Sequence, residues 1–312
     1  MKQEYSFLSH NKSNHIHCVR WIPEKEPIAI LYVIHGMQEY VERYQDFAEF
    51  MRRRGFLVAG HDHIGHGKTA WNISDLGNMH ATNPKKSMVE DITTHFQLLR
   101  KEYPTTPFFI LGHSMGSYLL RCFLAEKAPR LKSLTGVILM GTGTEKNSVL
   151  TAGRVVLHTL AVKNSWSHKS DFVKGLMFNS AYHKFNIDGT APENSWLSTN
   201  TEANRAFYAD PYCNYTFSLG GYLALVDAAM ESNLLKGIER IPKDLPIHFV
   251  SGSEDPVGGL GKGVNKAYQK FKKVGPTHVS IRMYKGLRHE LLHEPCRNEI
   301  YQDLYEWMST KI

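Results

Sequence analysis

The serine in a GxSxG pattern is the strongest chemical signal in the sequence. Gly112, Ser114 and Gly116 form this pattern between an apolar run at residues 108–111 and an amphipathic segment at residues 115–127. A nucleophile on a sharp strand-to-helix turn needs small residues on either side, because its backbone is strained and neighbouring chains pass close by. We therefore predict that Ser114 is a nucleophile that attacks an acyl carbon.

Two backbone amides are expected to hold the negative charge that such an attack creates. Met115 begins the helix after the serine, and the unpaired amides at a helix start favour an oxyanion. The second donor should come from the loop after the early strand at residues 28–34. His35 and Gly36 follow that strand, so we predict the amide of Met37 as the second donor.

A base and an acid must activate the serine, because a hydroxyl is a poor nucleophile at neutral pH. Both should follow the serine in the chain, first the acid and then the histidine. Asp255 lies in a loop rich in glycine and proline after a buried-strand pattern, and neighbouring Glu254 is the competing acid. His289 follows the last strand pattern and is the predicted base, with His293 as a competitor at helical spacing.

Three histidines in the segment GHDHIGHGKT invite a metal hypothesis. His61, His63 and His66 lie close together, but no clear carboxylate or thiolate completes a site of fixed geometry. We therefore predict no metal ion there. Acyl transfer through a serine requires no cofactor, and none is expected.

Alternating strand and helix patterns must position these residues. Apolar, β-branched runs bounded by turn residues predict strands at residues 15–22, 28–34, 56–59, 108–111, 136–140, 247–250 and 279–284. Helical patterns occupy residues 41–54, 87–103, 115–127, 261–273 and 295–310. Ser87 and Glu90 predict a capping box for the second helix. Short apolar strands that alternate with helices predict an α/β fold with a mostly parallel sheet covered on both faces.

Residues 144–242 interrupt this alternation. They contain helical periodicity, first at residues 149–162, but no convincing strand. An interval of this length is too long for an ordinary connection. We interpret residues 144–242 as a helical cap or lid, and residues 1–143 together with 243–312 as the core domain.

The bulk composition is that of a globular enzyme. Hydrophobic residues make up 42% of the chain and charged residues 21%, which excludes a disordered or collagen-like protein. The net charge of +7 comes from scattered Lys and Arg residues, so we predict no nucleic-acid partner. The sequence carries no signal for an oligomeric state.

The cellular compartment is predicted from what the sequence does not contain. The first residues have no apolar run of signal-peptide length, and no window is long and apolar enough for a membrane helix. Cys18, Cys122, Cys213 and Cys296 form no CxxC pair. We therefore expect a cytoplasmic protein with reduced, structural cysteines.

Five segments together resemble the monoacylglycerol lipase and lysophospholipase branch of the α/β-hydrolase family, which is also grouped with serine aminopeptidases. They read HGMQEYVERY, GHDHIGHGKT, GHSMGS, SGSEDP and GLRHELLHE, and the resemblance spans nearly the whole chain. It implies an α/β-hydrolase fold with a helical cap that is inserted after the sixth core strand and lies over an acyl pocket. It also implies the triad Ser114, Asp255 and His289 and the oxyanion amides of Met37 and Met115.

The motifs and the resemblance together predict a serine carboxylic-ester hydrolase. It would act on a small lipid-like ester through an acyl-enzyme intermediate. Transient contact of the cap with a membrane surface is a further hypothesis. An S33-type aminopeptidase or amidase is an alternative that needs an acidic anchor in the cap, for which Glu193, Glu202 and Asp210 are available. A non-catalytic ligand-binding relative is a second alternative, although such a relative usually has a damaged triad.

Overall fold

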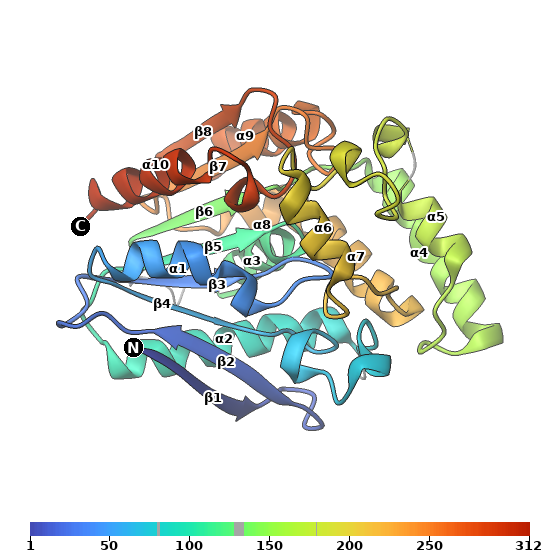
Figure 1. The fold of residues 1–312 in the computed structure, drawn as a ribbon, viewed down its shortest axis with the longest axis horizontal. Helices are drawn as coiled ribbons and strands as arrows, with labels where there is room; N and C mark the ends of the chain where they lie inside the picture. Colours follow the sequence, from blue (N-terminus) through green and yellow to red (C-terminus); the bar gives the residue numbers. More distant parts are fainter. Residues whose placement is uncertain (80–81, 128–133, 179) are drawn as a thin grey trace.

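One mixed sheet organises the chain in the computed structural model, which describes residues 1–79, 82–127, 134–178 and 180–312 (Figure 1). The eight strands lie in the order β1-β2-β4-β3-β5-β6-β7-β8. Their bounds are β1 (Lys2–Leu8), β2 (His15–Trp21), β3 (Ala29–Ile34), β4 (Phe56–His61), β5 (Phe108–His113), β6 (Gly136–Met140), β7 (Ile247–Gly252) and β8 (Val279–Tyr284). The pairs β1–β2 and β2–β4 are antiparallel, and the other pairs are parallel. The predicted mostly parallel sheet is confirmed.

The strand prediction missed β1. This strand lies at the edge of the sheet, is largely exposed, and therefore lacks the continuous apolar run that marks the buried strands. With β1 included, β6 is the sixth strand, and the helical segment follows it as predicted. Strands β4, β5 and β7 also run two residues beyond their predicted ends, because their last residues, such as Gly112 and His113, are small or polar.

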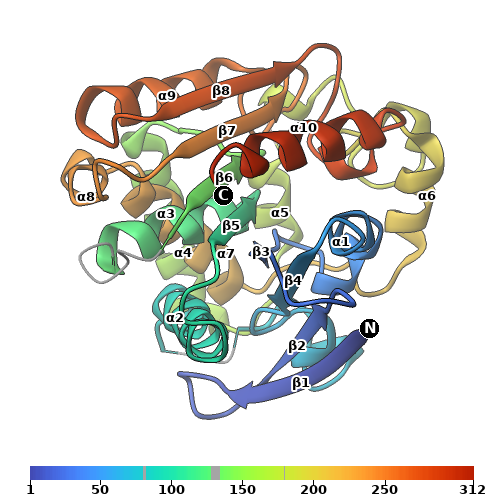
Figure 2. The same ribbon diagram turned by 90° about the vertical axis from the view of Figure 1, so that its left-hand side faces the viewer.

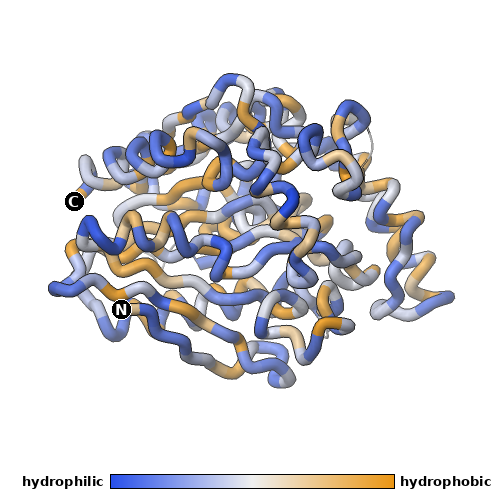
Figure 3. The backbone as a smooth tube through the Cα atoms, viewed as in Figure 1, coloured by the Kyte–Doolittle hydropathy of each residue, from blue (hydrophilic) through white to orange (hydrophobic). Residues whose placement is uncertain are grey.

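Helices cover both faces of the sheet (Figure 2). One face packs against α1 (Gln45–Arg52) and α10 (Arg297–Ser309), and the other against α2 (Pro84–Glu102), α3 (Met115–Lys127) and α9 (Lys262–Val274). Alternate residues of one strand therefore enter different cores: Phe108 and Ile110 join one, Phe109 and Leu111 the other. This burial on both faces explains the continuous apolar strands, which stand out in Figure 3.

The start of α2 differs from the predicted capping box. The helix begins at Pro84, and the side chain of Asn83 accepts a hydrogen bond from the amide of Lys86. Ser87 and Glu90 consequently lie inside the helix. Asparagine as the cap with proline as the first helical residue is an equally favourable start, which the prediction overlooked.

The segment at residues 144–242 is helical in its described part. It contains α4 (Asn147–Asn164), α5 (Asp171–Met177), α6 (Thr201–Ala209), α7 (Leu219–Ser232) and α8 (Leu235–Glu239). Helix α4 lies at the periphery of the molecule, whereas α7 packs against α3 (Figure 1). Within the described parts of the chain we find no helix with both the length and the apolar character needed to cross a membrane.

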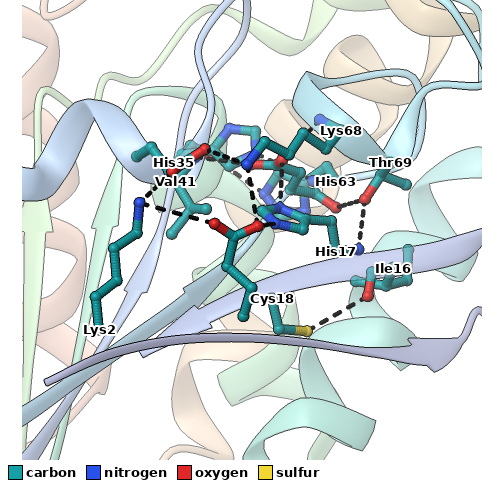
Figure 4. A network of polar contacts seen from close by, with 12 residues as sticks. Lys2, Ile16, His17, Cys18, His35, Val41, His63, Lys68 and Thr69 are labelled. Carbon is teal, nitrogen blue, oxygen red and sulfur yellow. Dashed lines mark hydrogen bonds and ion pairs between the residues drawn. The ribbon is translucent and has the colours of Figure 1, made fainter. Parts of the chain in front are cut away.

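The histidine-rich loop after β4 is held in place by Asp62. Its carboxylate accepts hydrogen bonds from the amides of Val41 and Lys68, each at 2.8 Å, and lies 3.0 Å from Nδ1 of His17. The hydroxyl of Thr69 donates to the carbonyl oxygen of Asp62 at 2.7 Å. Figure 4 labels His17 on β2 and Val41 in the turn before α1 beside Lys68 and Thr69 of the loop. Polar residues of this loop therefore stabilise its conformation through hydrogen bonds.

Histidines of this loop and its neighbours form a buried cluster at the ends of β3 and β4. The ring centroids of His35 and His63 are 4.3 Å apart, and Nδ1 of His61 lies 3.1 Å from Nδ1 of His95 on α2. Burial lowers the pKa of all these side chains, to about 4 for His66 and to about 3 for His95. The cluster is therefore neutral at pH 7.

The pKa values of other partly or fully buried histidines are shifted in both directions. Burial lowers the pKa of His248 on β7 and of His293 before α10 to about 4. Burial also opposes charge on His17 and His113, but neighbouring carboxylates outweigh it and raise the pKa of both. Among the described histidines whose pKa is shifted, the pKa is lowered more often than it is raised.

We predict that acid strongly destabilises this protein between about pH 7 and about pH 5. An unfolded histidine takes up a proton below its ordinary pKa of about 6.5, but a buried ring with a lowered pKa does not. The stability that these rings contribute is therefore present above that pKa and lost as the pH falls, by about 2 kcal/mol per neutral ring over this range. Urea unfolding at the two pH values measures the loss, and an unchanged midpoint would contradict the prediction.

Candidate active site

Ser114 lies between the end of β5 and the start of α3. Its φ is 51°, in the left-handed region that residues other than glycine rarely adopt. Its amide donates to the carbonyl oxygen of Met140 on β6 at 3.0 Å. Its side chain is half-buried, whereas those of His113 and Met115 are buried. The serine therefore stands on a strained strand-to-helix turn, as its pattern predicts.

Glycine flanks Ser114 because other backbone segments pass close to this turn. A β-carbon at Gly112 would lie 2.7 Å from the carbonyl oxygen of Gly116. A β-carbon at Gly116 would overlap two carbonyl oxygens at the end of β3, and one at Gly36 would lie 2.8 Å from the β-carbon of Ser114. The loop after β3 is therefore in direct contact with the serine turn.

Asp255 and His289 form a buried pair at the same edge of the sheet. Asp255 follows β7 and His289 follows β8, and Nδ1 of the histidine lies 3.0 Å from Oδ2 of the aspartate. Asp255 is 0% exposed and His289 is 2% exposed. The other carboxylate oxygen accepts a hydrogen bond from the amide of Val257 at 2.8 Å. Because Nδ1 faces Asp255, Nε2 is the nitrogen through which His289 could exchange a proton.

Ser114 and His289 both contact the end of β6. The serine amide bonds to Met140, and a β-carbon on the next residue, Gly141, would lie 3.0 Å from Cε1 of His289. The structure thus brings the predicted serine, acid and histidine to one edge of the sheet from β5, β7 and β8.

The two competing residues are engaged elsewhere. The side chain of Glu254 is 45% exposed and lies 4.0 Å from Lys184. His293 ends the short helix η7 (Leu291–His293) and lines a cavity of about 10 Å³ with Glu39 and Glu290. The hydrogen bond to Asp255 comes from His289.

Met37 and Met115 lie on the two segments that flank Ser114. Met115 is the first residue of α3. Met37 follows Gly36 in the loop that contacts the serine turn, and its half-buried side chain packs against the core. Their backbone amides therefore belong to the elements from which oxyanion donors are expected.

Sequence reasoning missed a group of buried charged residues behind these side chains. Arg43 donates to both carboxylate oxygens of Glu290, at 2.5 and 2.9 Å, and Oε1 of Glu39 lies 2.7 Å from Nδ1 of His113. Burial raises the pKa of both carboxyls, but attraction to His113 and Arg43 outweighs it and lowers each to about 2. We call these four residues the charge cluster. All four lie within the five segments that resemble the family, and this shared location is the signal in the sequence that could have identified them.

Aromatic side chains from residues 144–242 also reach the site. The ring centroid of Trp196 lies 5.1 Å from that of His289. Tyr182 and Phe178 pack against Trp196, with centroid distances of 5.3 and 5.7 Å. The helical segment therefore supplies an aromatic wall beside His289.

Known proteins are similar to this chain in sequence and in fold. The family model described as serine aminopeptidase, S33, matches residues 25–296. A monoglyceride lipase of Rattus norvegicus is 26% identical over 99% of this chain and 92% of the relative. A monoacylglycerol lipase of Mycolicibacterium smegmatis is 24% identical over 92% of this chain and 90% of the relative.

A solved structure gives the same result for the fold. The thermostable carboxyl esterase of Bacillus coagulans matches with a TM-score of 0.87 and 27% identity, covering 99% of this chain and 98% of the esterase. The predicted α/β-hydrolase fold and the predicted resemblance to monoacylglycerol lipases are therefore confirmed. The chain belongs to the serine aminopeptidase S33 family of α/β-hydrolases.

Proposed function

We propose that this protein is a serine hydrolase of carboxylic esters, with monoacylglycerols and related lipid-like esters as its substrates. The observation that carries the proposal is the buried His289–Asp255 hydrogen bond of 3.0 Å at the sheet edge where Ser114 stands on a strained turn. The similarity to monoacylglycerol lipases and to a carboxyl esterase supports the same reaction and substrate class.

The reaction would be acyl transfer in two steps. Nε2 of His289 takes the proton of Ser114 as the serine oxygen attacks the ester carbonyl, and Asp255 orients the ring through Nδ1. The imidazolium then protonates the leaving alcohol, and an acyl-serine ester remains. Water deprotonated by the same histidine attacks this ester, and the carboxylic acid leaves as Ser114 regains its proton.

The amides of Met37 and Met115 are the proposed oxyanion donors. Each lies on a segment whose backbone is fixed against the serine turn by glycine. Fixed donors stabilise developing charge without reorganisation, which is why such pairs contribute strongly to the rate of acyl transfer.

Residues 144–242 would serve as a cap that receives the acyl chain. The aromatic wall of Phe178, Tyr182 and Trp196 supports this role, because acyl-chain sites are lined mainly by apolar and aromatic side chains. Lysophospholipids remain within the proposed substrate class. A role in lipid metabolism and the expected cytoplasmic location stay predictions.

Peptidase activity is the second candidate, because the matching family model is that of serine aminopeptidases. The acidic residues available as an anchor for a substrate amino group are engaged or exposed: Asp210 accepts a hydrogen bond from the Tyr40 hydroxyl at 2.8 Å, and Glu193 and Glu202 face solvent. Ester hydrolysis is therefore the favoured reaction. Parallel assays with monoacylglycerols and aminoacyl naphthylamides separate the two activities.

We predict that Ser114→Ala and His289→Ala each reduce turnover of p-nitrophenyl butyrate by about 10³-fold or more. Ser114 forms the bond to the ester carbon, and His289 accepts the proton of the serine hydroxyl. Ser114→Ala should unfold in urea like the parent protein. His289→Ala removes the partner of buried Asp255, so it should stay folded, as checked by circular dichroism, but unfold at a lower urea concentration. Ser6→Ala, which alters an exposed serine on β1, is the matched control and should retain full activity. Near-normal turnover by Ser114→Ala would refute the assignment of the nucleophile.

Chemical labelling tests the alternative of a non-catalytic ligand-binding relative. A fluorophosphonate phosphonylates an activated serine hydroxyl and displaces fluoride, so mass spectrometry should find one adduct, on Ser114. A protein that only binds its ligand should stay unmodified.

We further propose that the cap touches the lipid surface through α4. Val155 and Val162 are 60% and 91% exposed, and their spacing of seven places them on one face of the helix. Within α4 acidic residues are absent, and the charged side chains are Lys163 and Arg154, of which Arg154 forms an ion pair with Asp227 at 3.0 Å. An exposed apolar face with basic Lys163 beside it suits the surface of an anionic membrane.

We predict that the double substitution Val155→Asp/Val162→Asp weakens binding to phosphatidylcholine–phosphatidylglycerol vesicles by about tenfold or more. Turnover of soluble p-nitrophenyl butyrate should not change, because the side chains of Val155 and Val162 are exposed to solvent. Leu98→Asp on α2, where the leucine is 43% exposed, is the matched control. Equal vesicle binding by parent and double variant, measured by sedimentation, would disprove this contact.

A further inference from the structure

We propose that His113, the residue before the nucleophile, is held as an imidazolium and acts with Glu39 as a positioning residue for His289. The inference rests on the proposed function, since it assigns His289 as the base. It concerns a part of the charge cluster that makes no contact with the reacting atoms in the two-step reaction above.

Both nitrogens of His113 face oxygen atoms that can only accept hydrogen bonds. Nδ1 lies 2.7 Å from Oε1 of Glu39, and Nε2 lies 3.3 Å from the backbone carbonyl oxygen of His289. A neutral imidazole carries one proton, so one of its nitrogens would present a lone pair to an acceptor. Only the doubly protonated ring can donate to both.

Glu39 cannot be the donor in its hydrogen bond with His113, because Oε1 already accepts hydrogen bonds from other groups. The amide of Gly36 and the hydroxyl of Tyr44 both donate to the same oxygen as His113. Glu39 is 3% exposed, and its carboxyl pKa is lowered to about 2, so it stays ionised. Its ionised oxygen therefore joins the oxyanion loop, through Gly36, to the histidine ring.

Charge balance also favours a protonated His113. The carboxylates of Glu39 and Glu290 carry two negative charges, and Arg43 neutralises one of them. The imidazolium of His113 would neutralise the other. An uncompensated charge in such a buried cluster would be costly.

Titratable groups reach this cluster from each element packed around His113. They are Glu39, Arg43 and Tyr44 from the β3–α1 connection, and His289, Glu290 and His293 from the segment after β8. Burial lowers the pKa of His113, but attraction to Glu39, its hydrogen bond and the charge of Glu290 outweigh this and raise it. Burial keeps His293 neutral by lowering its pKa to about 4.

The consequence is that His289 is held at two points. Its side chain is hydrogen-bonded to Asp255, and its backbone carbonyl oxygen accepts a hydrogen bond from His113. Through Glu39 the same network reaches Gly36, which precedes the proposed oxyanion amide of Met37. Loss of the His113 proton would release the carbonyl and weaken the alignment of base and oxyanion loop.

Glu39→Gln tests this device because the amide preserves shape but removes charge. The glutamine oxygen must still face Gly36 and Tyr44, so Nδ1 of His113 must still donate to it. Without the carboxylate the ring should lose its second proton within the neutral range, and that proton must come from Nε2. A lone pair would then face the carbonyl oxygen of His289.

We predict that the kcat of Glu39→Gln on p-nitrophenyl butyrate, relative to the parent, falls by about 10- to 100-fold between about pH 6 and about pH 9, with KM nearly unchanged. Glu294→Gln is the matched control, because Glu294 is another buried carboxylate near His289 that accepts from Ser198 and the Arg288 amide. Its activity ratio should not vary with pH. A ratio for Glu39→Gln that is also independent of pH would overturn the proposal.

A direct measurement does not depend on activity. With ¹⁵N-labelled histidine rings, the parent protein at about pH 8.5 should show a ring protonated on both nitrogens, and this signal should persist in His17→Gln and lose one proton in Glu39→Gln. If His17→Gln contains no doubly protonated ring, the proposal fails even if Glu39→Gln does not fold. A parent that shows this ring but hydrolyses no ester would refute the proposed function instead.

Discussion

The turn at Ser114 can exist only because glycine lets several backbone segments meet there. A left-handed backbone at a residue other than glycine costs on the order of 1–3 kcal/mol and persists only where its surroundings enforce it. Here the serine amide is bonded to β6, and Gly116 is packed against the carbonyl oxygens at the end of β3. The backbone conformation that these contacts enforce determines where the serine side chain begins. The other residues of the proposed site lie around that position.

The parallel sheet then determines which residues can reach the serine. Parallel strands bring their carboxyl ends to one edge, so the loops after β3, β5, β7 and β8 meet although they are far apart in the chain. The sheet core is apolar on both faces, and polar side chains collect at this edge. Asp255 and the charge cluster stay buried there because each carboxyl group has a hydrogen-bond partner: His289 for the aspartate, and Arg43 or His113 for the glutamates.

Much of this could be predicted from the sequence, because the relevant signals are local. Glycine spacing around Ser114 marks the turn, and apolar runs mark strands that are buried on both faces. Local patterns failed where another part of the chain decides the structure. β1 is an exposed edge strand defined by its pairing with β2, and α2 begins at an Asn-Pro cap that a second plausible cap concealed.

The charge cluster was missed for a similar reason. Glu39 and Arg43 are four residues apart and resemble an ordinary surface ion pair in the sequence. Their burial depends on Glu290, which is 247 residues from Arg43, and on His113. Sequence spacing contains no information on such distant partners. The aromatic wall formed by Trp196 is hidden in the same way, since its contact with His289 joins the helical segment to the core.

A crystal structure of the protein after reaction with an alkyl fluorophosphonate would show whether Ser114, His289 and the two amides act on the same acyl group. We expect phosphorus bonded to Oγ of Ser114, a phosphoryl oxygen within hydrogen-bond distance of the amides of Met37 and Met115, and the alkyl chain under residues 144–242. Nε2 of His289 should lie within about 3.2 Å of Oγ. Phosphorus on another residue, or a His289 ring directed away from a modified Ser114, would contradict this expectation.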